Sequence, residues 1–343
     1  MGRVPPAAPQ PPTVIDPAPA PGAGPGRRRA FAASALAGVV IGVTCVAFVV
    51  HRMVSQWNEV RDAVADASPG WLVAAVTLAG AAMTWIAACW RRAMRLVGAD
   101  PARRRTIAWY YAGEIGKYVP GGIWPVLGRG ELARRGGVPR LQAYPSVGLS
   151  LAALYLAGLV VATALVPLDL AEQSESPGAL ALLALLPIGL AVLHPRVLGW
   201  ACSRITRLTG RGGEVAVPPW RDTVGLVLGY VPAWLLIWGA TWCITRALVP
   251  DAPVLRIGIA ATLSWVAGFA AVPVPAGAGV REAVFVAAAG LPAGIGATVA
   301  VGSRLAFLLA DVAGALLTAP WHRASAGGPA APAPAGRPVD SPR

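Results

Sequence analysis

The sequence contains few charged residues and a single lysine. Of its 343 residues only 13% are Asp, Glu, Lys or Arg, whereas soluble domains carry about 25%. The uncharged residues form long apolar stretches with short basic stretches between them. This pattern excludes a soluble globular enzyme and predicts an all-α polytopic membrane protein with short loops.

Cysteine and histidine are also scarce, and they are scattered. They are Cys45, Cys89, Cys202 and Cys243, and His51, His194 and His322. Metal sites need clustered ligands, so we expect no metal. The sequence also lacks a P-loop and the common hydrolase motifs. We therefore expect no cofactor, no direct use of ATP, no catalytic residue and no enzymatic activity.

The net charge of +13 does not indicate nucleic-acid binding. The basic residues lie between apolar segments, where they typically mark cytoplasmic loops and contact anionic lipid. The strongest clusters, in 91–105 and 196–222, predict that both chain termini are cytoplasmic. The expected location is the cell (plasma or inner) membrane.

The apolar stretches predict about six full transmembrane helices. They cover 30–50, 71–90, 143–166, 178–195, 223–248 and 295–319. Pro-, Ala- and Gly-rich segments that cannot bury a core flank this region, which predicts disordered cytoplasmic tails at 1–29 and 323–343. The transmembrane domain is thus expected to occupy 30–322.

Two further apolar regions are interrupted by Gly and Pro. The first, 106–128, lies between two Arg-rich loops, and its unbroken part is about 18 Å long as a helix, too short for a bilayer core of about 30 Å. The second, 257–289, is broken around Pro273 and Gly279. We predict two re-entrant hairpins from opposite faces, which brings the total to about eight segments. Eight full spans remain the alternative.

The two interruptions share a pattern. Opposed broken segments in two halves of a chain are typical of an inverted repeat with a binding site at its interface. The predicted break residues are Pro120, Gly121, Gly122, Pro275, Gly277 and Gly279. Backbone that leaves helical geometry inside a membrane must line a cavity or be buried in protein.

Ionisable residues surround these breaks and are candidates for binding a lipid headgroup. They are Glu114, Lys117, Tyr118, Arg129, Arg281, Glu282, Arg304 and Asp311. Charged groups in a membrane are costly and usually functional, and basic groups beside exposed amide dipoles suit a phosphate. The structural alternative is mutual pairing, of Glu114 with Lys117 and of Arg304 with Asp311.

Two motifs resemble those of the lysylphosphatidylglycerol synthase transmembrane (flippase-like) family. The first is GEIGKYVPGGIW, from Gly113 to Trp124, followed by Gly128-Arg129; the second is PAGAGVRE, from Pro275 to Glu282. The resemblance covers about 31–320 and implies movement of aminoacylated phosphatidylglycerol or related lipids between leaflets. Full-length synthases also carry a soluble acyltransferase domain, which we do not expect here because the chain stops about twenty residues after its last predicted helix.

We expect a lipid translocase whose substrate is an anionic phospholipid or a polyprenyl-linked glycolipid. Two alternatives remain open: a non-transporting partner of a glycosyltransferase or another lipid-modifying enzyme, and a membrane enzyme acting on polyprenyl-phosphate lipids. The only obvious proton carriers are Glu114, Glu282 and Asp311. The sequence does not specify the lipid, the direction of transport or the oligomeric state.

Overall fold

The computed structural model describes residues 54–118, 124–172, 218–271 and 277–326, together with Ala47, Val50, His51 and Arg196. Within this part of the chain all regular structure is helical, which confirms the all-α prediction. The predicted spans 30–50 and 178–195 and the two predicted tails lie almost wholly outside the described residues.

Among the described residues, four long helices are apolar enough to cross a membrane. They are α3 (Pro69–Leu96), α6 (Arg140–Glu172), α9 (Trp220–Leu248) and α12 (Ala293–Ala326). Each contains one of the predicted spans at 71–90, 143–166, 223–248 and 295–319. The chain is therefore a polytopic membrane protein, and these four predictions are confirmed.

The first interrupted region forms a short helical hairpin. Its arms are α4 (Arg103–Glu114), extended by a 3₁₀ turn at Ile115–Tyr118, and α5 (Trp124–Arg135). The arms are antiparallel, because Gly116 faces Trp124 near the tip while Gly136 faces Trp109 near the base. With 12 residues each, the helical arms are about 18 Å long and do not cross a bilayer core.

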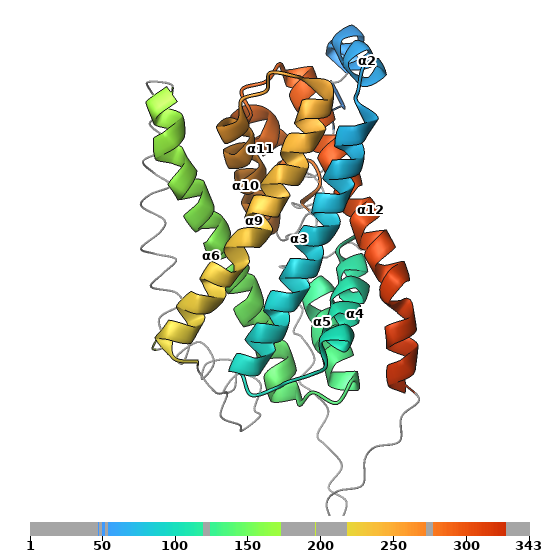
Figure 1. Ribbon diagram of the computed structural model, residues 1–343, viewed down its shortest axis with the longest axis vertical. Coiled ribbons are helices and arrows are strands. Elements are labelled where there is room, and N and C mark those ends of the chain that lie inside the picture. The colour runs from blue at the N-terminus through green and yellow to red at the C-terminus, as the bar shows by residue number, and fades with distance from the viewer. Residues whose placement is uncertain are drawn as a thin grey trace, which may run out of the picture.

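The second interrupted region forms a matching hairpin. Its arms are α10 (Val254–Ala270) and α11 (Val280–Ala288). Gly268 lies against Gly277 near the tip, and Arg256 lies against Gly290 near the base. Figure 1 shows α4 and α5 in one half of the molecule and α10 and α11 in the other. The prediction of two hairpins from opposite ends is confirmed for the described arms.

The helices form an inverted repeat. Each unit consists of a long helix, a hairpin and a second long helix, α3 to α6 in the first and α9 to α12 in the second. The helices α3 and α12 run away from the end that carries α2 (Trp57–Ala65), and α6 and α9 run back (Figure 1). Each unit thus crosses in the opposite sense to the other.

The packing of the helices follows the same symmetry. In the interior α3 packs on its counterpart α9. The contact of α4 with α12 has its counterpart in that of α10 with α6, and the contact of α5 with α6 in that of α11 with α12. The two hairpins are therefore each held by the last helix of both units.

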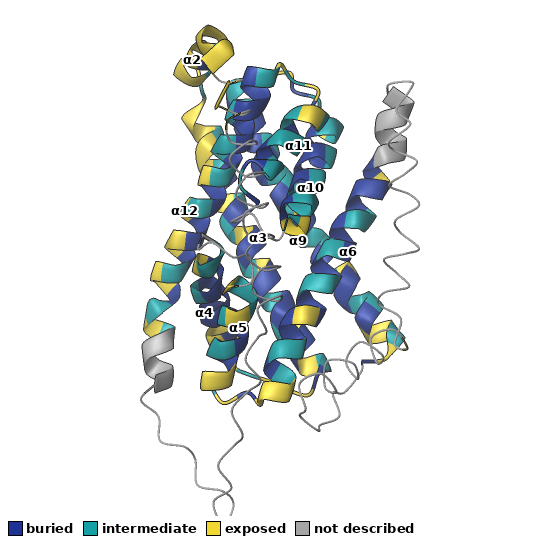
Figure 2. Cartoon of the chain, turned by 180° about the vertical axis from the view of Figure 1, so that it is seen from behind, coloured by how far each residue is buried: buried dark blue, intermediate teal, exposed yellow. Residues whose placement is uncertain are grey.

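Burial separates a protein-facing side from a lipid-facing side on the long helices. The core contains Trp90 of α3 and Tyr230 and Trp234 of α9, all fully buried. One face of α12 carries exposed apolar side chains (Figure 2), including Leu309, which is 57% exposed. In a membrane such a face contacts acyl chains at no cost.

Candidate functional site

A cavity lies where the described inner ends of the arms of the two hairpins meet. Its volume is about 150 Å³, and both hairpins and α6 contribute to its walls. Four of the predicted headgroup residues line it: Glu114, Lys117, Arg129 and Arg281. Three of these side chains are basic and one is acidic, so the wall carries a positive formal charge.

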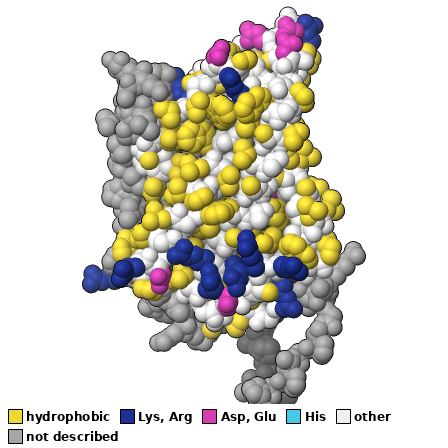
Figure 3. Space-filling model, viewed as in Figure 1, with side chains coloured by type: hydrophobic (Ala, Val, Ile, Leu, Met, Phe, Trp, Pro, Cys, Tyr) yellow, Lys and Arg dark blue, Asp and Glu magenta, His cyan; other side chains and the backbone are white. Residues whose placement is uncertain are grey.

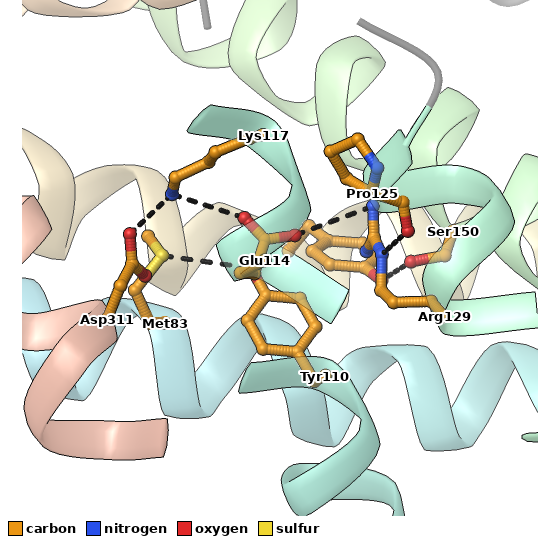
Figure 4. A network of polar contacts seen from close by, with 9 residues as sticks. Met83, Tyr110, Glu114, Lys117, Pro125, Arg129, Ser150 and Asp311 are labelled. Carbon is orange, nitrogen blue, oxygen red and sulfur yellow. Dashed lines mark hydrogen bonds and ion pairs between the residues drawn. The ribbon is translucent and has the colours of Figure 1, made fainter. Parts of the chain in front are cut away.

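Lys117 connects the first hairpin to α12. Its Nζ lies 2.5 Å from Asp311 Oδ2 and 3.2 Å from Glu114 Oε2 (Figure 4). Asp311 is fully buried, so its carboxylate holds the ammonium group from behind the cavity. The predicted pairing of Glu114 with Lys117 is confirmed, and the pairing with Asp311 was not predicted.

Arg129 is held from several directions on the opposite arm of the hairpin. It is 3% exposed, its Nη2 lies 3.7 Å from Glu114 Oε1, and its Nε donates to the Pro125 carbonyl at 3.2 Å. The guanidinium carbon also lies 5.3 Å from the centre of the Tyr110 ring. Figure 4 shows the contacts of Arg129 with Glu114 and Pro125, which together hold its guanidinium group in place.

Arg281 enters the cavity from the second hairpin. Its guanidinium carbon lies 4.0 Å from the centre of the Trp265 ring, within the range of a cation–π interaction. The stem of the side chain passes over Gly268, where a Cβ atom would lie 2.2 Å from Arg281 Cγ. Only glycine at position 268 leaves room for this arrangement.

The start of α11 combines two glycines with a buried carboxylate. Gly277 and Gly279 have φ angles of +64° and +81°, which other residues rarely adopt. The backbone N–H of Gly279 donates to Glu282 Oε2 at 2.6 Å, and Arg304 Nη1 lies 2.7 Å from Glu282 Oε1. Glu282 thus caps α11 and connects it to α12.

The remaining predicted residues have other positions. The alternative pairing of Arg304 with Asp311 is wrong, because Arg304 pairs with the second hairpin and Asp311 with the first. Glu282 and Arg304 line a smaller, adjoining pocket together with Ser264 and Ser303. The breaks Pro120, Gly121, Gly122 and Pro275, and the side chain of Tyr118, lie outside the described residues.

Glu131 follows Arg129 by two residues but does not join the cavity. It lies near the basic end of α5, where Arg134 and Arg135 bond to it at 2.7–3.0 Å. The hydrogen bonds from Arg134 and then Arg135 hold the pKa of the Glu131 carboxyl well below its usual range. Its role is a surface ion pair, unlike that of the buried Glu282.

Aromatic residues of the cavity were not among the predicted site residues. They are Tyr110, Tyr155, Trp265 and Phe269. A search for charged groups overlooks them, but one signal was present in the sequence. Phe269 directly follows Gly268, just as Glu114 directly follows Gly113, so alignment of the two interrupted regions would have brought Phe269 into consideration.

Within the described part of the chain, no group of three His, Cys, Asp or Glu side chains is placed to hold a metal ion. The expectation that the protein uses no metal or cofactor stays a prediction.

Comparison with protein families gives one match over most of the chain. The family model described as "Lysylphosphatidylglycerol synthase TM region" matches residues 35–318. This range includes α3, α6, α9 and most of α12, together with both hairpins and the cavity. Comparison with curated proteins gives no significant match.

Proposed function

Because the chain belongs to the lysylphosphatidylglycerol synthase transmembrane family, we propose that it is a lipid translocase. It moves an anionic or glycosylated lipid headgroup between the leaflets while the acyl chains stay in the bilayer. The observation that carries this proposal is the basic cavity at the meeting point of two opposed hairpins. An anionic headgroup halfway across a membrane needs such a polar, positively charged place.

The distribution of charge supports an orientation in the membrane. Figure 3 shows Lys and Arg side chains gathered at the end of the molecule opposite α2. By the positive-inside rule this end faces the cytoplasm, so the first hairpin enters from the cytoplasmic side and the second from outside. The proposal includes the location of the protein in the cell membrane and the position of both termini on the cytoplasmic side.

The test is transport in proteoliposomes with purified protein. Vesicles would contain phosphatidylglycerol with a fluorescent label on its acyl chain, and a reagent that quenches the outer leaflet would report exchange. We expect the wild-type protein to make the inner-leaflet pool accessible, and Lys117→Ala or Arg281→Ala to reduce the exchange rate at least about tenfold, since each loses a charge-assisted contact worth about 1.5–3 kcal/mol.

The matched control is Arg135→Ala. It also removes one positive charge from the first hairpin, but its side chain is 72% exposed and does not line the cavity. It should keep the wild-type exchange rate. Wild-type rates in folded Lys117→Ala and Arg281→Ala would overturn the proposal.

Two expectations about this chain remain predictions. One is that it has no enzymatic activity of its own, and the other is that a glycosyltransferase or another lipid enzyme associates with it. Neutralising Arg103, Arg104 and Arg105 at the basic end would abolish co-purification of such a partner.

A further inference from the structure

We propose that one wall of the central cavity, formed by α6 and the tip of α10, receives the acyl chains of the bound lipid. The headgroup then faces α12, and the chains leave the cavity along α6. This inference rests on the proposed translocase function, and it assigns a place to the acyl chains of the substrate.

The inverted repeat identifies the equivalent positions in the two hairpins. A Cβ atom on Gly113 would lie 2.5 Å from Arg129 Cγ, and one on Gly268 would lie 2.2 Å from Arg281 Cγ. In both hairpins a glycine of the first arm thus accommodates the stem of an arginine from the second arm. The residues that follow these glycines, Glu114 and Phe269, occupy equivalent places.

Equivalent places have opposite chemistry. On the side of the first hairpin, Glu114 pairs with Lys117, which in turn pairs with Asp311 of α12. On the side of the second hairpin, Phe269 stacks on Tyr155 of α6, with ring centres 3.9 Å apart and an interplanar angle of 22°. The cavity therefore has a charged side towards α12 and an aromatic side towards α6.

The side of the cavity towards α6 is lined mainly by apolar residues. Leu151, Leu154 and Tyr155 of α6 line the cavity there, together with Val126 of α5. The helix α6 packs on both α5 and α10, so it passes the meeting point of the hairpins. Phe269 is 44% exposed and forms an apolar edge to the opening.

The volume of the cavity determines which part of the lipid it can hold. At about 150 Å³ the cavity is smaller than the roughly 300–1,000 Å³ of sites that enclose a drug-sized ligand. A headgroup phosphate fits, but two acyl chains do not. Chains that leave past Lys117 and Glu114 would desolvate charges, whereas Leu151, Leu154 and Phe269 on the other side are apolar.

The test is photo-crosslinking in bilayers with the full chain. The probes are phosphatidylglycerol and phosphatidylcholine, each with a diazirine group in the acyl chain, and peptide mass spectrometry maps the adducts. The readout is the ratio of adducts on residues 147–155 of α6 to adducts on the exposed face of α12. The second quantity reports bulk lipid in the same sample.

We expect this ratio to be several-fold higher with phosphatidylglycerol than with phosphatidylcholine. In Arg281→Ala, which no longer anchors the headgroup, the two ratios should become equal. Leu151→Trp should also lower the phosphatidylglycerol ratio, because the larger side chain narrows the cavity beside α6. Leu141→Trp, an exposed position on the same helix, is the matched control and should keep the wild-type ratio.

Native mass spectrometry of the same protein samples separates the two proposals. If phosphatidylglycerol is retained in an Arg281-dependent way but the adduct ratio is the same for both probes, the acyl-chain assignment is wrong and the headgroup site stands. If neither retention nor the ratio depends on Arg281, both proposals fail.

Discussion

At the scale of single residues, the decisive contact is the one between Lys117 and Asp311. Asp311 has no exposed surface, and Lys117 is the only lysine of the chain. Removing one partner of a buried ion pair leaves a charge without compensation, which costs about 3–5 kcal/mol, whereas replacing both by apolar residues is often neutral. The pair therefore allows structure and function to be separated.

We predict that Lys117→Met lowers the thermal stability of the detergent-solubilised protein and that adding Asp311→Leu restores most of it. The double variant should still be defective in lipid exchange, because the cavity has lost its ammonium group. Melting curves and the vesicle assay together check this. A double variant that transports at the wild-type rate would show that Lys117 serves structure alone.

At the scale of the elements, the hairpins depend on close approach between their two arms. Both have glycine in the first arm facing arginine in the second, and the second hairpin adds two positive-φ glycines before α11. Neither hairpin gains much from helix propensity, since isolated helices of this length are marginal in water. They are held by packing on α6 and α12.

Gly268→Ala tests this requirement. The added methyl group would lie 2.2 Å from Arg281 Cγ and 2.6 Å from its Cδ, so Arg281 must leave its position over Trp265. We expect a loss of about 1–3 kcal/mol from overpacking and a fall in lipid exchange comparable to that of Arg281→Ala. Gly148→Ala on α6 has no atom within 4 Å of the new methyl group and should be neutral in both measurements.

At the scale of the whole molecule, the inverted repeat and the charge distribution together set the topology. Loops at the two ends of the molecule should face opposite aqueous compartments, while the described ends of the hairpin arms next to the breaks lie between them (Figure 1). This arrangement differs from eight full spans at one place, the tips, which would then reach the aqueous phase on the far side.

Cysteine labelling in cells checks this topology. In a variant without the native cysteines, an impermeant maleimide should label Asp251→Cys from outside and Asp100→Cys only after the cytoplasmic side is opened. Trp124→Cys, near the tip of the first hairpin, should react from neither side. Labelling of Trp124→Cys from outside would mean that the arms of this hairpin cross the membrane.

The sequence by itself determined the membrane class, the long spans and the existence of the two interrupted regions. These follow from local quantities, namely the length of apolar stretches, the position of Arg clusters and the breaks at Gly and Pro. The four basic and acidic residues of the cavity wall could also be predicted, because a charge near a broken helix stands out against an apolar background.

Only the tertiary structure decided which charges pair between distant elements and which wall of the cavity is apolar. Arg304 and Asp311 lie on one helix, so local spacing favours their pairing, but each meets a different hairpin in the fold. The place of Phe269 opposite Tyr155 likewise depends on α6, because Tyr155 lies more than a hundred residues before Phe269 in the sequence. Such contacts arise from packing between distant segments, and no local pattern encodes them.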